Sequence, residues 1–428
     1  MLSRYYLAMA LKVVFASHVS SLQGGAERSL LELALALKKD GRIAPVVTVP
    51  RDGALAARLR AESIPTAVLP TRWWALPSES YRLPVFVPGV ARPGWKVLGM
   101  ALNLGPWCRW LRAARPDVVV TNTAVIPVPA LACAIVGVPH VWRVHEFVTK
   151  DHGLRYVLGE AFSRRTIGWT SKVVVVNSQA VRDHYSPPIP RDKVRVLDQA
   201  ITGFQPTPNA VDPPNVRALV LGALAPTKGI PVALEAAKIL VAPPAPESAG
   251  GPAADSAAEP VRLQLRLVGP VLPSYRQELD RLVATLGIGD CVEIRQATPT
   301  PQIELAWANV LVMCSDNEAF GRVTVEGLKS GRPVVGTRSG GTVELVFPGV
   351  NGLLFSPGDA QELAAALRTL AGDPAMLERM SENAIASTEG RFTTEEEVEE
   401  FVAVLTQAAG RERGTTGEGS ARPQRRRA

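Results

Sequence analysis

Short apolar segments rich in valine recur along the chain and alternate with helix-like segments. Residues 173–176 are four consecutive valines, and such continuous apolar runs are typical of strands buried on both faces of a parallel sheet. The segment 24–41, "GGAERSLLELALALKKDG", has apolar residues at helical spacing and ends in Gly41, a residue suited to a helix C-cap. The alternation therefore predicts an α/β fold built on parallel sheets.

The expected strands fall into two groups separated by residues 201–215, a segment with four prolines and no apolar periodicity. A chain of 428 residues also exceeds one ordinary core. We therefore expect two Rossmann-like domains facing each other across a cleft, with ligands at the carboxyl ends of the strands. The expected strands are 12–17, 44–50, 66–70, 117–122, 140–145 and 172–178, then 217–222, 263–269, 291–296, 310–315 and 333–337.

Composition also indicates the domain bounds and the segments that lie outside the two expected domains. The expected N-terminal domain spans 11–203, and the expected C-terminal domain spans 217–394 after a linker at 204–216. Residues 242–260 are of low complexity and predict a disordered insertion. A final acidic helix is expected at 395–410, followed by a disordered basic tail at 411–428.

The four cysteines lack CxxC or CxxH spacing, which argues against a zinc site or a disulfide framework and fits a reducing cytoplasm. The apolar run before Lys12 is too short for a signal-peptide core. Residues 118–139 hold no charge, yet their three prolines favour strand, loop and buried helix over a membrane span. We expect a cytoplasmic protein without a spanning helix.

Two glutamates flank a Phe-Gly step in "SDNEAFGRVTVEGLKSGRPVVGT", residues 315–337. Glu318 is expected in the loop after a strand, and Glu326 early in a helix that begins near Arg322. Free amides at that helix end, with Gly321 allowing close approach, form an anion site beside two carboxylates that can accept hydroxyl hydrogen bonds. The pattern indicates a nucleotide-sugar pocket. The plainer alternative is that Glu318 caps the helix and Glu326 is solvated.

The run "EAFGRVTVEGLKSGRPVVGTRSGGTVELV" (318–346) resembles the E-x7-E segment of retaining GT-B-fold glycosyltransferases of family 4, which use nucleotide sugars. The similarity extends over most of the chain in the order expected for that family. It includes the glycine loop and first helix, the last N-domain strand and helix, the first C-domain strand and the C-terminal segment. These are "GGAERSLLELALAL", "VVVVNSQAVRDHY", "LVLGALAPTKGI" and "NGLLFSPGDAQELAAAL".

The resemblance implies roles for the C-terminal half. Glu326 would hold the ribose hydroxyls of the donor, and Glu318 would lie beside the donor sugar. Lys228 would neutralise the diphosphate as it becomes the leaving group. Backbone amides for the sugar hydroxyls would come from Ala319, Phe320 and Gly321.

In the N-terminal half, the resemblance implies that Gly24 and Gly25 bring backbone amides close to phosphate or acceptor. His145 would contact the donor sugar near the reacting carbon, and His18 is a weaker candidate for the acceptor. Each has a plainer alternative. His145 could be a satisfied residue at a strand end, and the two glycines could form only a turn.

The sequence departs from the family at Ala223, where family members commonly have an arginine that pairs with the lysine on the diphosphate. Either Arg322 or Arg338 supplies the charge instead, or leaving-group stabilisation is weaker. The alternative function is then a catalytically weak sugar-nucleotide-binding or accessory subunit. A sugar-nucleotide epimerase is not supported, since the matching motifs are those of transferases.

The family mechanism implies transfer with retention of anomeric configuration, which depends on positioning and charge stabilisation rather than on a side-chain nucleophile. A covalent role for Glu318 is the less favoured variant. No acidic metal cluster of the DxD type accompanies the site, so we expect no metal and no cofactor besides the nucleotide diphosphate sugar, which is the substrate.

The formal net charge of +7 is concentrated in two places. Residues 72–115 carry seven basic residues against Glu79, and the tail carries six arginines against two glutamates. Five of the eight tryptophans fall at 73–110, a combination that suits the boundary of an anionic membrane. A saccharide or lipid-linked acceptor of cell-surface polysaccharide or glycolipid synthesis is therefore expected. The alternative is that tryptophans pack in the core. No nucleic-acid module is present in the sequence, and no nucleic-acid partner is expected.

Overall fold

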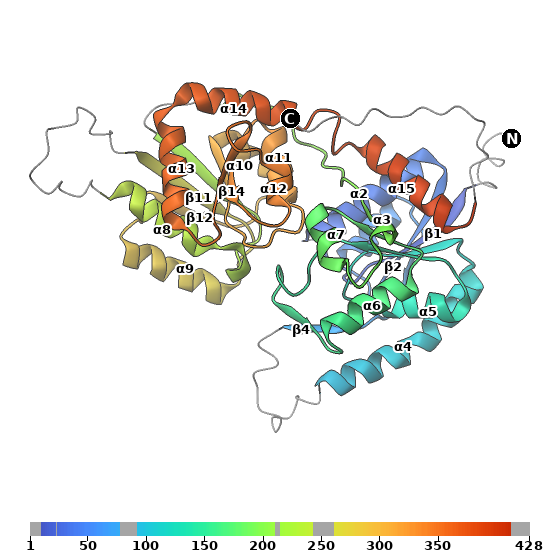
Figure 1. Cartoon of the computed structure of the whole chain (residues 1–428). Coiled ribbons are helices and arrows are strands. Elements are labelled where there is room, and N and C mark those ends of the chain that lie inside the picture. Colours follow the sequence, from blue (N-terminus) through green and yellow to red (C-terminus); the bar gives the residue numbers. More distant parts are fainter. Residues whose placement is uncertain (1–9, 23, 78–91, 210–214, 243–260, 412–428) are drawn as a thin grey trace, which may run out of the picture.

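The computed structural model describes residues 10–22, 24–77, 92–209, 215–242 and 261–411. Two lobes are visible, each built around one parallel sheet (Figure 1). Only residue 242 of the expected insertion (242–260) and residue 411 of the expected tail (411–428) are described. The other residues of both segments lie outside the described ranges. The two Rossmann-like α/β domains expected from the sequence are confirmed.

The first sheet has seven parallel strands in the order β3-β2-β1-β5-β6-β8-β9. All six expected strands are present, and the short edge strand β9 was not foreseen. A separate antiparallel pair, β4 and β7, was also missed, because three-residue strands have no measurable periodicity. The bounds are β1 Leu11–Ala16, β2 Ile43–Val49, β3 Thr66–Val68, β4 Ala75–Pro77, β5 Val118–Thr121, β6 His140–Val144, β7 Leu154–Tyr156, β8 Val173–Val176 and β9 Val194–Val196.

The second sheet has six parallel strands in the order β12-β11-β10-β13-β14-β15. Five were expected, and the edge strand β15 was missed because its sequence "GLLF" was assigned only to a family motif. The bounds are β10 Asn215–Leu221, β11 Arg262–Val268, β12 Val292–Arg295, β13 Val310–Met313, β14 Val334–Thr337 and β15 Gly352–Phe355.

Helices cover both faces of each sheet, which explains why most of the strands are apolar on both sides. On the first sheet, α4, α5, α6 and α7 pack on one face, and α2, α3 and α15 on the other. The helices there are α2 Gly25–Asp40, α3 Ala54–Ala61, α4 Arg92–Ala114, α5 Val128–Val136, α6 Glu160–Thr170, α7 Gln179–Tyr185 and α15 Thr394–Ala408. On the second sheet they are α8 Ile230–Val241, α9 Pro273–Leu286, α10 Pro301–Trp307, α11 Arg322–Lys329, α12 Thr342–Leu345, α13 Ala360–Gly372 and α14 Pro374–Ala386.

In both sheets the strand order reverses beside the first strand of the domain. β1 lies between β2 and β5, and β10 lies between β11 and β13. The loops that leave the carboxyl ends of such neighbouring strands diverge to opposite faces and open a crevice between them, where ligands of doubly wound sheets bind. The chain after β1 and β5, and after β10 and β13, is therefore where a site is expected.

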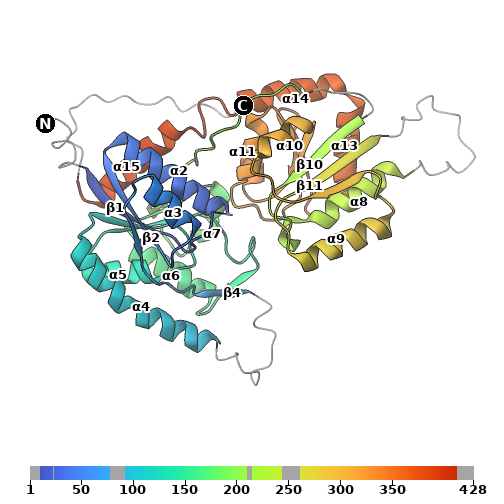
Figure 2. The ribbon, with the colours of Figure 1, turned by 180° about the vertical axis from the view of Figure 1, so that it is seen from behind.

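The final helix, α15, belongs to the core of the first sheet although it follows the second in sequence. Figure 2 shows it beside α2 and α3. Phe401 stacks on Phe15 of β1 with ring centroids 6.1 Å apart, and Val398 and Leu405 are buried in the same cluster. The chain therefore crosses between the domains twice, and α15 anchors the second crossing.

The uncharged segment 118–139 forms β5, a loop, α5 and the turn before β6, as predicted. Within the described residues no helix is both long and apolar enough to cross a membrane. In the tryptophan-rich region the alternative of core packing is confirmed for Trp74 and Trp107, which are buried in the core of the first domain.

Four of the five histidines have their pKa lowered by burial, which makes folding sensitive to acid. His140, on β6, is the simplest case. It is buried, its Nε2 lies 2.8 Å from Oγ1 of Thr121, and burial lowers its pKa to about 3. An unfolded chain takes up a proton on this residue near pH 6.5, whereas the folded chain does not. Its contribution to stability is therefore complete above pH 6.5 and is lost as the pH falls toward the folded pKa.

We predict that the urea midpoint of unfolding falls steadily between pH 7 and pH 5, and that the variant His140→Gln reduces this slope. Glutamine can keep a hydrogen bond to Thr121 but does not titrate. Each buried neutral histidine contributes at most about 1.4 kcal/mol per pH unit. Equal slopes in the wild type and the variant would contradict the assignment.

Candidate functional site

A cleft of about 660 Å³ lies between the domains, where loops from the carboxyl ends of both sheets meet. Most of the residues singled out from the sequence line it. Ala319 does not: its side chain packs in the core of the first domain, and its carbonyl accepts a hydrogen bond of 2.5 Å from Ser178 Oγ. The predicted residues that line the cleft are His18, Gly24, Gly25, His145, Lys228, Glu318, Phe320, Gly321, Arg322 and Glu326.

Of the two arginines considered as replacements at Ala223, Arg322 lines the cleft together with Ala223. Arg338 is exposed, is not among the lining residues, and donates to the carbonyl of Leu354 at 3.3 Å. The option that Arg338 supplies the missing charge is therefore wrong, because its side chain lies along β15 instead.

The loop after β13 has the predicted form. Helix α11 begins at Arg322, and Gly321 before it has φ +93°, a left-handed conformation that favours glycine. A Cβ at this position would lie 3.0 Å from Thr324 Oγ1. The first amides of α11 have no carbonyl partner within the helix, so its positive end faces the cleft.

Two glycines of the neighbouring loop support this backbone. Gly341 N donates to the carbonyl of Glu318 at 2.7 Å. Gly340 has φ +53°, and a Cβ there would lie 2.3 Å from the same carbonyl oxygen. The close approach of the two loops therefore requires glycine at Gly340, and it fixes the position of Glu318.

Lys228 and Glu318 form an ion pair at the centre of the C-terminal wall, with Nζ and Oε2 2.8 Å apart. Gly229 makes this possible: its φ is +63°, and a Cβ there would lie 2.2 Å from the carbonyl oxygen of Cys314. Burial disfavours the charged lysine, but the Glu318 carboxylate outweighs burial and leaves the pKa of Lys228 above its ordinary value. The lysine is therefore a cation at neutral pH.

Arg322 connects the two domains. Its Nε donates to Glu326 at 3.1 Å, and its two terminal nitrogens each lie 3.2 Å from the carboxylate of Glu32 on α2. Burial raises the pKa of Glu326, and the nearby guanidinium opposes that rise. The ribose candidate Glu326 is thus mostly buried and held at one oxygen by a residue that also contacts the first domain.

The first-domain wall carries His145 directly after β6. Its Nε2 lies 3.1 Å from Asn122 Oδ1. The next residue, Glu146, accepts from Thr123 Oγ1 at 2.5 Å, from Ala124 N at 2.7 Å and from His145 N at 3.1 Å. This buried carboxylate ties together the loops after β5 and β6 and so fixes the backbone of His145.

Sequence reasoning missed several lining residues of the first domain. Glu146 had a detectable signal, a carboxylate directly after a strand end, and Arg28 and Glu27 lie within the glycine segment that was already singled out. Glu27 is buried, one of its carboxylate oxygens has no hydrogen-bond partner among the described residues, and burial raises its pKa. Trp73 had no local signal: it tilts over His18 with ring centroids 5.4 Å apart.

The loop after β12 also borders the cleft. Ala297, Thr298 and Pro301 line it, with Gly269 and Pro270 from the loop after β11. None of these is aromatic. Among the described residues no group of three or more His, Cys, Asp or Glu side chains is arranged to hold a metal ion.

We predict that Gly340→Ala displaces the Glu318 loop and destabilises the protein by about 1–3 kcal/mol through strain and the contact with the Glu318 carbonyl. Gly358→Ala is the matched control, since Gly358 has φ +79° but a Cβ there meets nothing within 4 Å. Thermal unfolding compares the two variants. Equal losses would mean that left-handed backbone strain alone, and not the close approach, requires glycine at Gly340.

Comparison with known proteins adds two family models and several relatives. "Glycosyltransferase Family 4" matches residues 23–201, and "Glycosyl transferases group 1" matches residues 205–387. A D-inositol 3-phosphate glycosyltransferase of Thermobispora bispora is 32% identical over 223 residues, which cover 47% of each protein. The lipopolysaccharide core biosynthesis glycosyltransferase LpsE of Rhizobium meliloti is 31% identical over 30% of this chain and 38% of LpsE. These matches span less than half the length of the curated relatives.

Solved structures are similar over nearly the whole chain. Alr3699/HepE of Anabaena, in complex with UDP, superposes with a TM-score of 0.69 at 23% identity, over 93% of this chain and 100% of that one. The sucrose-phosphate synthase of Thermosynechococcus elongatus gives 0.70 at 17% identity, over 94% and 100%. Together the two family models match most of the sequence, each on one sheet of the fold. The chain therefore belongs to the group 1, family 4 glycosyltransferases and has their GT-B arrangement of two Rossmann-like domains.

Proposed function

We propose that this protein transfers a sugar from a nucleotide diphosphate donor to an acceptor hydroxyl. The observation that carries the proposal is the convergence of Lys228, Glu318 and Glu326 on one cleft beside the positive end of α11. A cation and a helix end suit a diphosphate, and the two carboxylates suit ribose and sugar hydroxyls. His145 and the glycine loop bound the same cleft from the opposite domain.

The donor requires an exchange of partners on the C-terminal wall. Lys228, now paired with Glu318, would turn to the diphosphate and stabilise the charge that develops as the sugar–phosphate bond breaks. Glu318, released from the lysine, would accept a hydrogen bond from the donor sugar. The pair thus keeps both charges compensated in a partly buried place until the donor supplies new partners.

Transfer would proceed with retention of configuration. The acceptor oxygen bonds to the anomeric carbon from the side that the phosphate leaves, and the departing phosphate oxygen takes the acceptor's proton. Nucleophilic attack by Glu318 is the less favoured variant, because once Lys228 turns to the diphosphate the Glu318 carboxylate is assigned to a hydroxyl of the donor sugar. We further propose that the reaction needs no metal, since Lys228 and the end of α11 can stabilise the diphosphate.

Uridine diphosphate sugars are the first donors to test. The Anabaena protein, which has the same fold, is described in complex with UDP and with UDP-glucose. For the acceptor we propose a saccharide or lipid-linked hydroxyl used in cell-surface polysaccharide or glycolipid synthesis, and the names of the relatives add inositol phosphate to the candidates.

A membrane-bound acceptor is supported by the outer surface of the first domain. Neighbouring helices α4, α5 and α6 expose Leu102, Ile135 and Trp169, of which Trp169 is 73% exposed. Exposed arginines on the same helices include Arg112 and Arg165. Helices that expose both apolar side chains and arginines suit peripheral binding to an anionic membrane.

A second candidate, a sugar-nucleotide-binding subunit with little turnover, is favoured by Ala223 and by the pairing of charges in the cleft. Arg322 is engaged by Glu32 and Glu326, and Lys228 by Glu318. Unless the donor rearranges these pairs, the leaving group would lack the second cation common in the family.

The test of the proposed function measures binding and turnover separately. Calorimetry with uridine, guanosine and adenosine diphosphate sugars identifies the donor, and release of the free nucleoside diphosphate measures its consumption. We predict that Glu326→Ala weakens donor binding by about 1.5–3 kcal/mol, or roughly ten- to a hundredfold, through loss of hydrogen bonds to a charged group. Glu278→Ala, an exposed change on α9, is the control.

Unchanged donor affinity in Glu326→Ala would contradict the ribose assignment. Tight binding by the wild type without nucleotide release, across saccharide and lipid-linked acceptors, would favour the non-catalytic candidate. Absence of binding to all three donor classes would overturn both.

For the membrane surface, we predict that the protein floats with vesicles of phosphatidylcholine and phosphatidylglycerol but not with phosphatidylcholine alone, and that added salt weakens the binding. The double variant Leu102→Glu/Trp169→Glu should lose flotation, because it puts negative charge on the apolar contact. Its turnover with a soluble acceptor is the control for folding. Flotation unaffected by salt and by this variant would contradict the proposal.

A further inference from the structure

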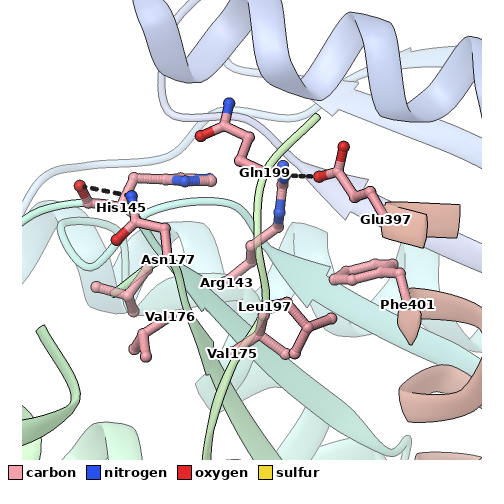
Figure 3. A pocket seen from close by; sticks show the side chains of 10 residues that line it. Arg143, His145, Val175, Val176, Asn177, Leu197, Gln199, Glu397 and Phe401 are labelled. Atoms are coloured by element: carbon pink, nitrogen blue, oxygen red, sulfur yellow. Dashed lines mark hydrogen bonds and ion pairs between the residues drawn. The ribbon is translucent and has the colours of Figure 1, made fainter. Parts of the chain in front are cut away.

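A buried ion pair joins the C-terminal helix to the strand that carries His145. Glu397 of α15 and Arg143 of β6 are both buried, and Oε1 and Nη2 lie 2.5 Å apart (Figure 3). The Arg143 guanidinium also lies over the Phe401 ring, 5.6 Å from its centroid. A buried guanidinium without a counter-charge is costly, so Glu397 is what allows an arginine at this position.

Arg143, held in place by Glu397, in turn orients the side chain of Asn122. Its Nη1 donates to Asn122 Oδ1 at 3.0 Å, while Asn122 Nδ2 donates to the carbonyl of Ala26 at 3.2 Å. Since a guanidinium only donates and a carbonyl only accepts, the two contacts together fix which way the Asn122 amide faces. Its oxygen is therefore the atom that meets His145.

The amide orientation decides the protonation of the imidazole. His145 Nε2 lies 3.1 Å from Asn122 Oδ1, which can only accept, so Nε2 must carry the hydrogen. Nδ1 is then the unprotonated nitrogen, and it is buried with no hydrogen-bond partner in the described structure. A buried acceptor without a partner is incompletely hydrogen-bonded, and because His145 lines the cleft a ligand hydroxyl can supply the missing donor.

The groups that face His145 also favour its neutral form. Burial is the largest cause of its lowered pKa, followed by the positive charge of Arg143, by His18 from the loop after β1 and by Arg322 from α11. The carboxylate that follows His145 in sequence, Glu146, accepts hydrogen bonds from Thr123 Oγ1 and from the amides of its own loops.

Glu397 holds a third element as well. Its Oε2 accepts from Ala200 N at 3.1 Å, in the segment where the chain first leaves the N-terminal domain. Beside it, Arg391 pairs with Asp198 at 2.9 Å. The Glu397 carboxylate thus connects β6 to both segments in which the chain crosses between the domains.

We propose that Glu397 is a positioning residue. Through Arg143 and Asn122 it holds His145 as the neutral Nε2–H tautomer, and the free Nδ1 accepts a hydrogen bond from a hydroxyl of the bound sugar donor. The last clause rests on the proposed function, whereas the tautomer does not.

The test is nuclear magnetic resonance of the full chain labelled with ¹⁵N in its histidines, with His145→Gln used to assign the signal. In the wild type, the nitrogen shifts of His145 should show the Nε2–H form without protonation from pH 8 to pH 5.5. In Glu397→Gln, Arg143 loses its counter-charge, which loosens its hold on the Asn122 amide, so a mixture of tautomers is expected. Asn122→Leu, which removes the acceptor, should give a mixture as well.

Glu399→Gln is the matched control, the same change on the same helix, where Glu399 pairs at the surface with Arg42 at 2.7 Å. It should leave the His145 signals unchanged. If Glu397→Gln does not fold, Glu397→Asp, which keeps the charge but withdraws it from Arg143, is read in the same way. A wild type with Nδ1–H, or a folded Glu397 variant with an unaltered tautomer, would overturn the proposal.

Turnover provides the second measurement. Glu397→Gln should lower kcat by about tenfold with a smaller change in the KM for the donor, since it loosens a contact beside the reacting carbon rather than the nucleotide. Equal kcat in the variant and the wild type would overturn the role toward the sugar. If no donor is consumed although His145 has the stated tautomer, the proposed function fails. The positioning of His145 by Glu397 through Arg143 and Asn122 then still stands.

Discussion

Parallel strand pairing is the constraint from which the site follows. In each sheet every strand runs in the same direction, so the loops after the strands emerge at one edge. The strand order reverses beside β1 and β10, which opens a crevice at that edge in each domain. With the two crevices facing each other, residues as distant in sequence as His18 and Glu326 come to line one cleft. Functional side chains therefore have to be placed only near the ends of strands for them to reach the cleft.

Charge pairing is the second theme of the cleft. Lys228 with Glu318, and Arg322 with Glu32 and Glu326, place each of these charges within hydrogen-bonding distance of an opposite charge. Such pairs in partly buried places are held by geometry as much as by charge, because desolvation offsets much of the Coulombic gain. A diphosphate entering the cleft would compete for the same cations. The ion pairs of Arg322 also link the N-terminal helix α2 to α11. A diphosphate that competes for Arg322 would therefore affect a contact between the two domains.

The C-terminal helix α15 packs the end of the chain back onto the first domain. An acidic final helix at 395–410 was expected, and α15 is found at Thr394–Ala408. Its acidic composition does not single out any one glutamate, yet Glu397 is buried and paired with Arg143. Nothing local distinguishes Glu397 from Glu395 or Glu396 except its register with Val398 and Phe401 on the buried side. The partner in β6 lies more than 250 residues away and cannot be found from local pattern.

The sequence by itself determined the α/β class, most of the strands, the loop at Glu318–Gly321 and the start of α11, because periodicity, glycine and valine runs are local signals. The family resemblance added residues that line the cleft, among them His18, His145 and Lys228. Tertiary structure alone decided that Trp74 and Trp107 are core residues, that Arg338 lies outside the cleft, and that Lys228 meets Glu318. It also placed Glu397 against Arg143. The reason is physical: burial and ion pairing depend on which elements pack together, and that packing is a property of the whole chain rather than of any segment.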